Sequence, residues 1–111
     1  MISKELIDFV DNHYEWLKNK YKIDDKQKEI LFRAVKLSEE VGELSQEILS
    51  HNSLQLKRKL DNYKKGNMEG EFADVIITTL LLAKSADVDV RKALENKIEK
   101  EKLNHKKSMM S

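Results

Sequence analysis

Four carboxylates stand in two pairs that share one spacing. Glu40 and Glu43 lie three residues apart within SEEVGEL, and Glu71 and Asp74 lie three residues apart within EFAD. On a helix, this spacing puts both carboxylates of a pair on one face. If the two helices pack together, the four charges come close enough to repel strongly. A hard divalent cation with oxygen ligands, Mg²⁺ or Mn²⁺, would neutralise them.

A plainer interpretation stays open for each pair taken alone. The chain is 37% charged, and acidic strings in such a sequence are usually solvated helix faces. Both pairs, however, stand among apolar residues, and Asp74 directly precedes the apolar run VIITTLLLA. None of the three histidines (His13, His51 and His105) follows a glutamate by three positions, so a di-iron carboxylate bundle is not expected.

Composition favours a single all-α domain. The chain has 111 residues, no proline, no cysteine and only three glycines, whereas all-β proteins need many turn residues. The formal net charge of +1 gives no reason to expect nucleic acid or an anionic membrane as a partner. The longest apolar stretch is too short to span a bilayer, and the first residues do not resemble a signal peptide. We therefore expect a cytoplasmic protein.

Hydrophobic periodicity predicts four helices, over residues 3–21, 25–49, 68–85 and 90–107. Their expected N-caps are Ser3, Asp24 or Asp25, Asn67, and Asp87 or Asp89. The third helix contains five consecutive β-branched residues, 75–79, which alone would suggest a strand. A helix is favoured because the chain offers no convincing second strand. Residues 50–66 are expected to connect the second and third helices, with a short helix at 54–63, and residues 108–111 to be a disordered tail.

The segment LSEEVGELSQEI, followed by EFADVIITTLLLA, resembles the all-α nucleotide pyrophosphohydrolases of the MazG type. That superfamily also includes dimeric dUTPases and phosphoribosyl-ATP pyrophosphohydrolases. Its signature, Glu-Glu-x-x-Glu and then Glu-x-x-Asp after a variable gap, falls on Glu39, Glu40, Glu43, Glu71 and Asp74. The resemblance implies a MazG-like four-helix bundle that hydrolyses nucleoside triphosphates between the α and β phosphates, releasing pyrophosphate with the help of Mg²⁺.

The resemblance also assigns roles to these residues. It implies that Glu40, Glu43, Glu71 and Asp74 are metal ligands. Glu39 and Glu40 are the catalytic candidates, with Glu39 as an additional ligand or as the residue that positions or deprotonates the attacking water. In the last helix, the resemblance implies substrate contacts from the following polar and basic residues: Asn96, Lys97, Lys100 and Lys102.

Further substrate contacts follow from residue types. Lys36 lies one turn before Glu40, where it could reach a phosphate or form a helix ion pair. Trp16, Tyr14 and Phe32 could stack on a base, although core packing is favoured for Trp16 and Phe32. The basic stretch 57–65 could close over a triphosphate, but a solvated connector is favoured. Gly42, in mid-helix, would be explained by a close helix contact.

Three functions remain open from the sequence. The first is a general nucleoside triphosphate pyrophosphohydrolase. The second is a relative with a narrower substrate, dUTP, dCTP or phosphoribosyl-ATP. The third is a catalytically silent helical interaction module. Because a bundle of this size has little room for a nucleotide pocket, we also expect a homodimer or homotetramer with the base pocket near the subunit interface.

Overall fold

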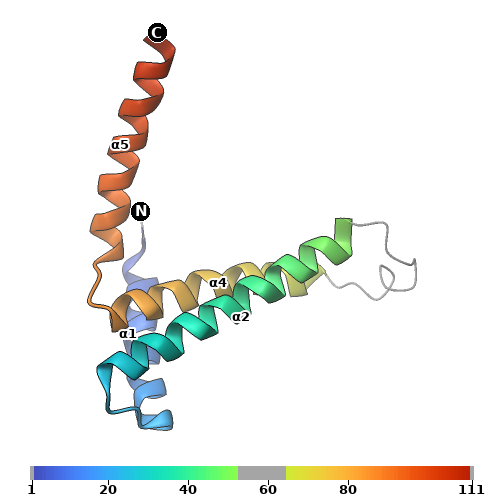
Figure 1. Ribbon diagram of the computed structural model, residues 1–111, viewed down its shortest axis with the longest axis vertical. Helices are drawn as coiled ribbons and strands as arrows, with labels where there is room; N and C mark the ends of the chain where they lie inside the picture. Colours follow the sequence, from blue (N-terminus) through green and yellow to red (C-terminus); the bar gives the residue numbers. More distant parts are fainter. Residues whose placement is uncertain (1, 53–64, 111) are drawn as a thin grey trace.

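The computed structural model describes residues 2–52 and 65–110, and within them all regular structure is helical. The helices are α1 (Lys4–Tyr21), α2 (Lys26–Asn52), α4 (Lys65–Ser85) and α5 (Val90–Met110). Helices α2 and α4 pack side by side in opposite directions, and α1 crosses them near one end (Figure 1). The prediction of an all-α fold is confirmed.

Three of the predicted helix starts are capped as their sequences indicate. The Ser3 side chain accepts a hydrogen bond from the backbone N–H of Leu6 (3.2 Å). Asp25, rather than Asp24, accepts from the N–H of Gln27 (2.9 Å). Asp89 accepts from the N–H of Lys92 (3.1 Å), while Asp87 adopts the left-handed conformation in the preceding turn. These caps satisfy N–H groups that have no partner inside the helix.

The third helix starts earlier than the sequence predicted. Because α4 begins at Lys65, Asn67 lies inside its first turn, and its prediction as the N-cap is wrong. Gly66 does not interrupt the helix, since no described glycine has a positive φ. The β-branched run is helical as expected, and the Thr79 hydroxyl donates to the Val75 carbonyl one turn earlier (2.7 Å). Packing against α2 therefore overrides the local preference for a strand.

Two other boundaries also differ from expectation. Helix α2 continues through residues 50–52, which the sequence assigned to the connector, and α5 continues to Met110 through most of the expected disordered tail. The predicted short helix at 54–63, and with it nearly all of the basic stretch 57–65, lies outside the described residues.

The hydrophobic core lies where α1 meets α4. Val10 and Tyr14 of α1 pack with Leu80 and Leu81 of α4. Helix α5 departs from the expected bundle because it projects from the end of α4 and none of its residues is buried (Figure 1). No described helix is both long and apolar enough to cross a membrane. A single chain therefore packs α1, α2 and α4 together, while α5 is attached near its start, where Val90 packs against the core.

A buried hydrogen bond ties α1 to the start of α2. The Tyr14 hydroxyl donates to Oε2 of Glu29 (2.8 Å), and the Glu29 residue is only 3% exposed.

Replacing Tyr14 with phenylalanine is expected to lower the free energy of unfolding by about 1.5–3 kcal/mol, because a buried carboxylate loses a donor. Urea unfolding measures this loss. Tyr21→Phe removes a hydroxyl from a half-exposed ring and should change stability little. An equal loss in both variants would contradict the assignment.

Candidate metal centre

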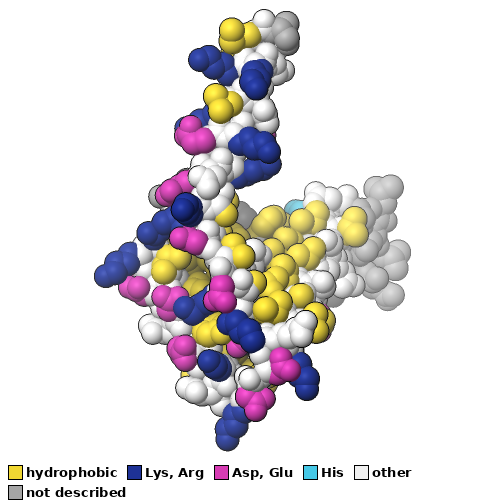
Figure 2. Space-filling model, turned by 60° about the vertical axis from the view of Figure 1, so that its left-hand side comes forward, with side chains coloured by type: hydrophobic (Ala, Val, Ile, Leu, Met, Phe, Trp, Pro, Cys, Tyr) yellow, Lys and Arg dark blue, Asp and Glu magenta, His cyan; other side chains and the backbone are white. Residues whose placement is uncertain are grey.

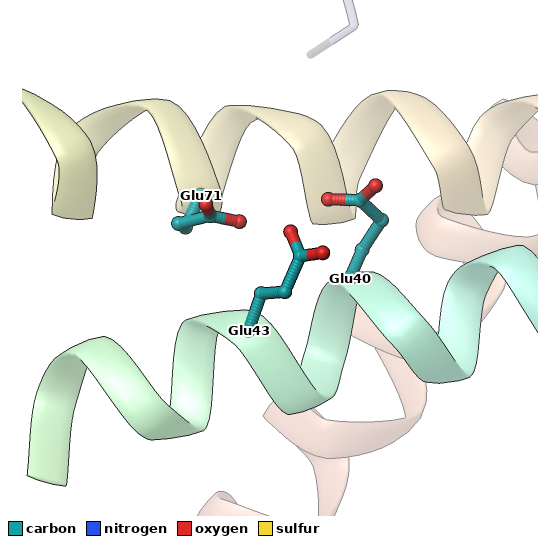
Figure 3. Close-up of side chains that lie close together, drawn as sticks. All are labelled: Glu40, Glu43 and Glu71. Carbon is teal, nitrogen blue, oxygen red and sulfur yellow. The ribbon is translucent and has the colours of Figure 1, made fainter.

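Three of the predicted ligands meet between α2 and α4. Glu40 and Glu43 project from successive turns of α2 toward Glu71 on α4 (Figure 3). Each offers a carboxylate oxygen, and these three oxygens all lie within 4.8 Å of one another. The antiparallel packing of the two helices thus converts two distant stretches of sequence into one acidic cluster.

The cluster is short of positive charge and of hydrogen-bond donors. Oε2 of Glu40 and Oε2 of Glu71 are buried and have no hydrogen-bond partner among the residues that the structure describes. Burial, and then the charges of Glu43 and Asp74, raise the pKa of Glu40 above 4.5. Burial and the neighbouring Glu43 carboxylate likewise raise the pKa of Glu71 above 4.5. Buried carboxylate oxygens without donors are costly, so the arrangement favours a bound cation or proton.

The donor set fits a hard divalent cation. Mg²⁺ prefers carboxylate oxygens at about 2.0–2.1 Å, so ligands on opposite sides of the ion lie roughly 4 Å apart. Ligands at right angles lie roughly 3 Å apart, so three oxygens that all lie within 4.8 Å of one another are close to the spacing of ligands on one ion. Glu40, Glu43 and Glu71 would hold the ion, and their few protein ligands would leave positions for water or phosphate oxygens.

The other two acidic residues of the motif lie outside this group of three. Asp74 is exposed one turn further along α4, yet its charge contributes to the raised pKa of both Glu40 and Glu71. Glu39 is exposed and forms an ion pair with Lys36, with 3.3 Å between Oε2 and Nζ. Asp74 is therefore near the cluster, whereas Glu39 faces solvent beside it.

A hollow of about 210 Å³ opens next to the cluster, and Glu40 forms part of its wall. Lys36 and Phe32 also line it, so the structure brings Lys36 to the site that its spacing suggested. Trp16 does not line this hollow. It is 54% exposed and stacks on His13 (5.6 Å between ring centroids), so the favoured prediction of core packing is wrong for Trp16.

The substrate candidates of the last helix are not brought to the cluster within one chain. Asn96, Lys97 and Lys100 are all exposed on α5, which projects away from α2 and α4 (Figure 1). The same is true of Lys102, and Lys97 forms an ion pair with Glu101 (3.2 Å). Their assignment as substrate contacts stays a prediction.

One residue beside the cluster was not singled out in the sequence. Arg33 is only 4% exposed and lines the hollow with Lys36 and Glu40. Its Nε atom is buried and has no hydrogen-bond partner in residues 2–52 and 65–110. The signal was present, because positions 33, 36 and 40 follow helical spacing on one face. The sequence feature that indicates a special role for Arg33 is its position as a single charged residue within the apolar stretch ILFRAV.

The raised pKa values predict how pH affects the metal-free protein. Because the pKa of Glu40 and of Glu71 exceeds 4.5 in the folded state, the folded protein binds protons more readily than the unfolded chain just above that pH. This difference in proton binding makes the free energy of unfolding rise as pH falls from 7 toward 4.5. Urea unfolding in EDTA measures the effect. A Glu40→Gln, Glu71→Gln double variant should lose this effect, and identical pH profiles would contradict the expectation.

Comparison with known proteins agrees with this geometry. The family model described as the MazG nucleotide pyrophosphohydrolase domain matches residues 31–109, well over half of the chain. The matched range contains all five acidic residues of the motif. No curated protein and no solved structure gives a significant match. The length of the family match, which spans most of α2, all of α4 and almost all of α5, shows that the chain belongs to the MazG nucleotide pyrophosphohydrolase family.

Proposed function

We propose that this protein is a Mg²⁺-dependent nucleoside triphosphate pyrophosphohydrolase that releases a nucleoside monophosphate and pyrophosphate. The observation that carries the proposal is the cluster of Glu40, Glu43 and Glu71, in which two buried carboxylate oxygens have no donor in the described part of the chain. A hard cation on these oxygens would also bind phosphate oxygens, which is the chemistry that the family membership implies.

The chain's own residues have separable tasks in this reaction. Glu40, Glu43 and Glu71 would hold the metal, and Asp74 would join them after a side-chain rotation. The bound ion would supply charge neutralisation at the phosphates and a polarised water. Glu39 would position or deprotonate the attacking water, because it stands beside Glu40 and is open to solvent. Water is then added across the bond between the α and β phosphates, and pyrophosphate leaves.

Pyrophosphate release from a panel of canonical and modified NTPs and dNTPs tests this function. Release should require Mg²⁺ or Mn²⁺, stop in EDTA, and be lost in Glu40→Gln. The panel should include dUTP, dCTP and phosphoribosyl-ATP, since a narrow substrate would show as activity on one of them alone. If folded protein releases pyrophosphate from none of these, the proposal fails and the silent interaction module becomes the better interpretation.

We also propose that the protein is a homo-oligomer, at least a dimer, which associates through an exposed apolar stripe on α2. Leu31, Val35 and Leu49 are each at least 58% exposed and fall on one helix face together with Gly42. A hydrophobic area runs along the α2–α4 arm in Figure 2. A Cβ at Gly42 would meet nothing within 4 Å, so the close contact expected there is not made by the described residues. A second copy is the occupant that would make use of it, because most soluble oligomers are homo-oligomers.

Val35→Lys is expected to shift the protein from dimer or larger to monomer, because a charge would be buried within the stripe. Size-exclusion chromatography with light scattering at micromolar concentration measures the mass. Asn19→Lys adds the same charge at an exposed position of α1 and should leave the mass unchanged. A wild-type protein that is monomeric at this concentration would contradict the proposal.

A further inference from the structure

Arg33 is a buried cation that the acidic cluster does not account for. Its residue is 4% exposed, and its Nε has no hydrogen-bond partner within the described residues. The Cζ atom of its guanidinium lies over the Phe32 ring, 5.3 Å from the ring centroid. A ring face attracts a cation but accepts no N–H hydrogen bond of ordinary strength. Burying a guanidinium in this way is costly unless an acceptor arrives.

The position of Arg33 indicates where such an acceptor would sit. Arg33, Lys36 and Glu40 follow one another on a single face of α2, and all three line the same hollow of about 210 Å³. Thr78 and Leu81 of α4 and several residues of α1 complete its wall. The same hollow is therefore lined by the buried arginine and by a proposed metal ligand.

The charges of the neighbouring side chains and the size of the hollow indicate what kind of ligand would bind there. If Glu40 binds a cation, its negative charge is already compensated, and Lys36 shares its charge with Glu39 outside the cluster. No described residue then supplies an anion to the guanidinium of Arg33, and a phosphoryl group matches its planar row of donors. The hollow is smaller than the roughly 300–1,000 Å³ of pockets that enclose whole drug-sized ligands. It has room for part of a nucleotide.

We propose that Arg33 is a substrate-binding residue, which donates hydrogen bonds to a phosphoryl group of the nucleotide beside the metal at Glu40. This inference rests on the proposed function and extends it to a specific residue. A site built in this way stores an unfavourable buried charge in the free protein and relieves it only when the substrate binds. Substituting Arg33 should thus weaken phosphate binding while making the ligand-free protein more stable.

Calorimetric titration of inorganic pyrophosphate in saturating Mg²⁺ tests the assignment without knowledge of the base. Arg33→Met keeps an apolar stem of similar length and should weaken pyrophosphate binding about tenfold or more, the loss expected for a hydrogen bond to a charged group. Arg33→Lys keeps the charge without the planar fork and should fall between wild type and Arg33→Met. The matched control is Arg91→Met, at an exposed arginine on α5 whose guanidinium donates to the Ile2 carbonyl (3.1 Å). It should bind like wild type.

Two further readouts separate substrate binding from a structural role. Mn²⁺ affinity, measured alone by electron paramagnetic resonance, should be unchanged in Arg33→Met, and its melting temperature without ligand should not fall. Unchanged pyrophosphate affinity, or an equal loss of Mn²⁺ affinity, overturns the assignment, as does a wild type that binds no pyrophosphate at millimolar concentration. If Arg33→Met does not fold, Arg33→Lys decides by the same criteria.

The outcome for Arg33 is distinguishable from the outcome for the proposed function. Mg²⁺-dependent pyrophosphate release by wild type, with hydrolysis and binding unaffected in Arg33→Met, would retain the enzyme and reject the role of Arg33. Binding of pyrophosphate that depends on Arg33, in a protein that hydrolyses no nucleotide, would retain the phosphate site and reject the enzyme.

Discussion

Replacing Glu71 with glutamine is expected to lower kcat/KM for pyrophosphate release by about a thousandfold, the scale of several kcal/mol of transition-state stabilisation from a metal ion. Glu71 is the α4 member of the cluster, and its buried Oε2 has no donor within the described residues. An amide keeps the shape of the side chain but offers a neutral, weaker ligand. Steady-state kinetics at saturating Mg²⁺, with circular dichroism to verify folding, measures the loss.

Without metal, Glu71→Gln should be more stable than the wild type, although the variant loses activity. Because burial and neighbouring carboxylates raise the pKa of Glu71, removing its charge relieves repulsion in the metal-free protein. Glu69→Gln is the matched control, since it makes the same chemical change at an exposed position two residues earlier on α4. It should keep full activity. Equal activity of Glu71→Gln and Glu69→Gln would remove Glu71 from the metal centre.

Mg²⁺ is expected to stabilise the folded protein strongly. A ligand that binds only the folded state at a hundred times its Kd contributes about 2.7 kcal/mol. For a domain of about this length, that corresponds to a rise in melting temperature of roughly 10 °C. The gain arises because the ion removes the repulsion among Glu40, Glu43 and Glu71. Thermal unfolding in EDTA and in increasing Mg²⁺, at fixed protein concentration and ionic strength, measures the rise.

Two comparisons make this measurement specific. NaCl at matched ionic strength should give little of the effect, since screening is weaker for buried charges than for exposed ones. Glu43→Gln should lose most of the Mg²⁺-dependent rise, because one of the three clustered ligands becomes neutral. A rise of the same size in NaCl, or in Glu43→Gln, would show that Mg²⁺ acts elsewhere on the chain.

Local features of the sequence were sufficient for much of the fold. The caps at Ser3 and Asp89 depend on side chains that reach N–H groups within three residues. The acidic pairs depend only on helical spacing, so Glu40 and Glu43 could be placed on one face before any packing was known. The prediction of Asn67 as an N-cap was wrong because α4 starts before this residue, so its side chain does not stand at the helix end.

The packing between helices determined features that the spacing of residues along the sequence could not predict. The sequence by itself determined an all-α chain, two acidic pairs on helix faces and a family signature, because each of these depends on residues close together in the chain. Only the tertiary structure brought Glu71 to Glu40 and Glu43, buried Arg33 beside them, and left Trp16 and α5 exposed. Burial and charge proximity arise between residues far apart in sequence, so they are properties of how α1, α2 and α4 pack and not of any one helix.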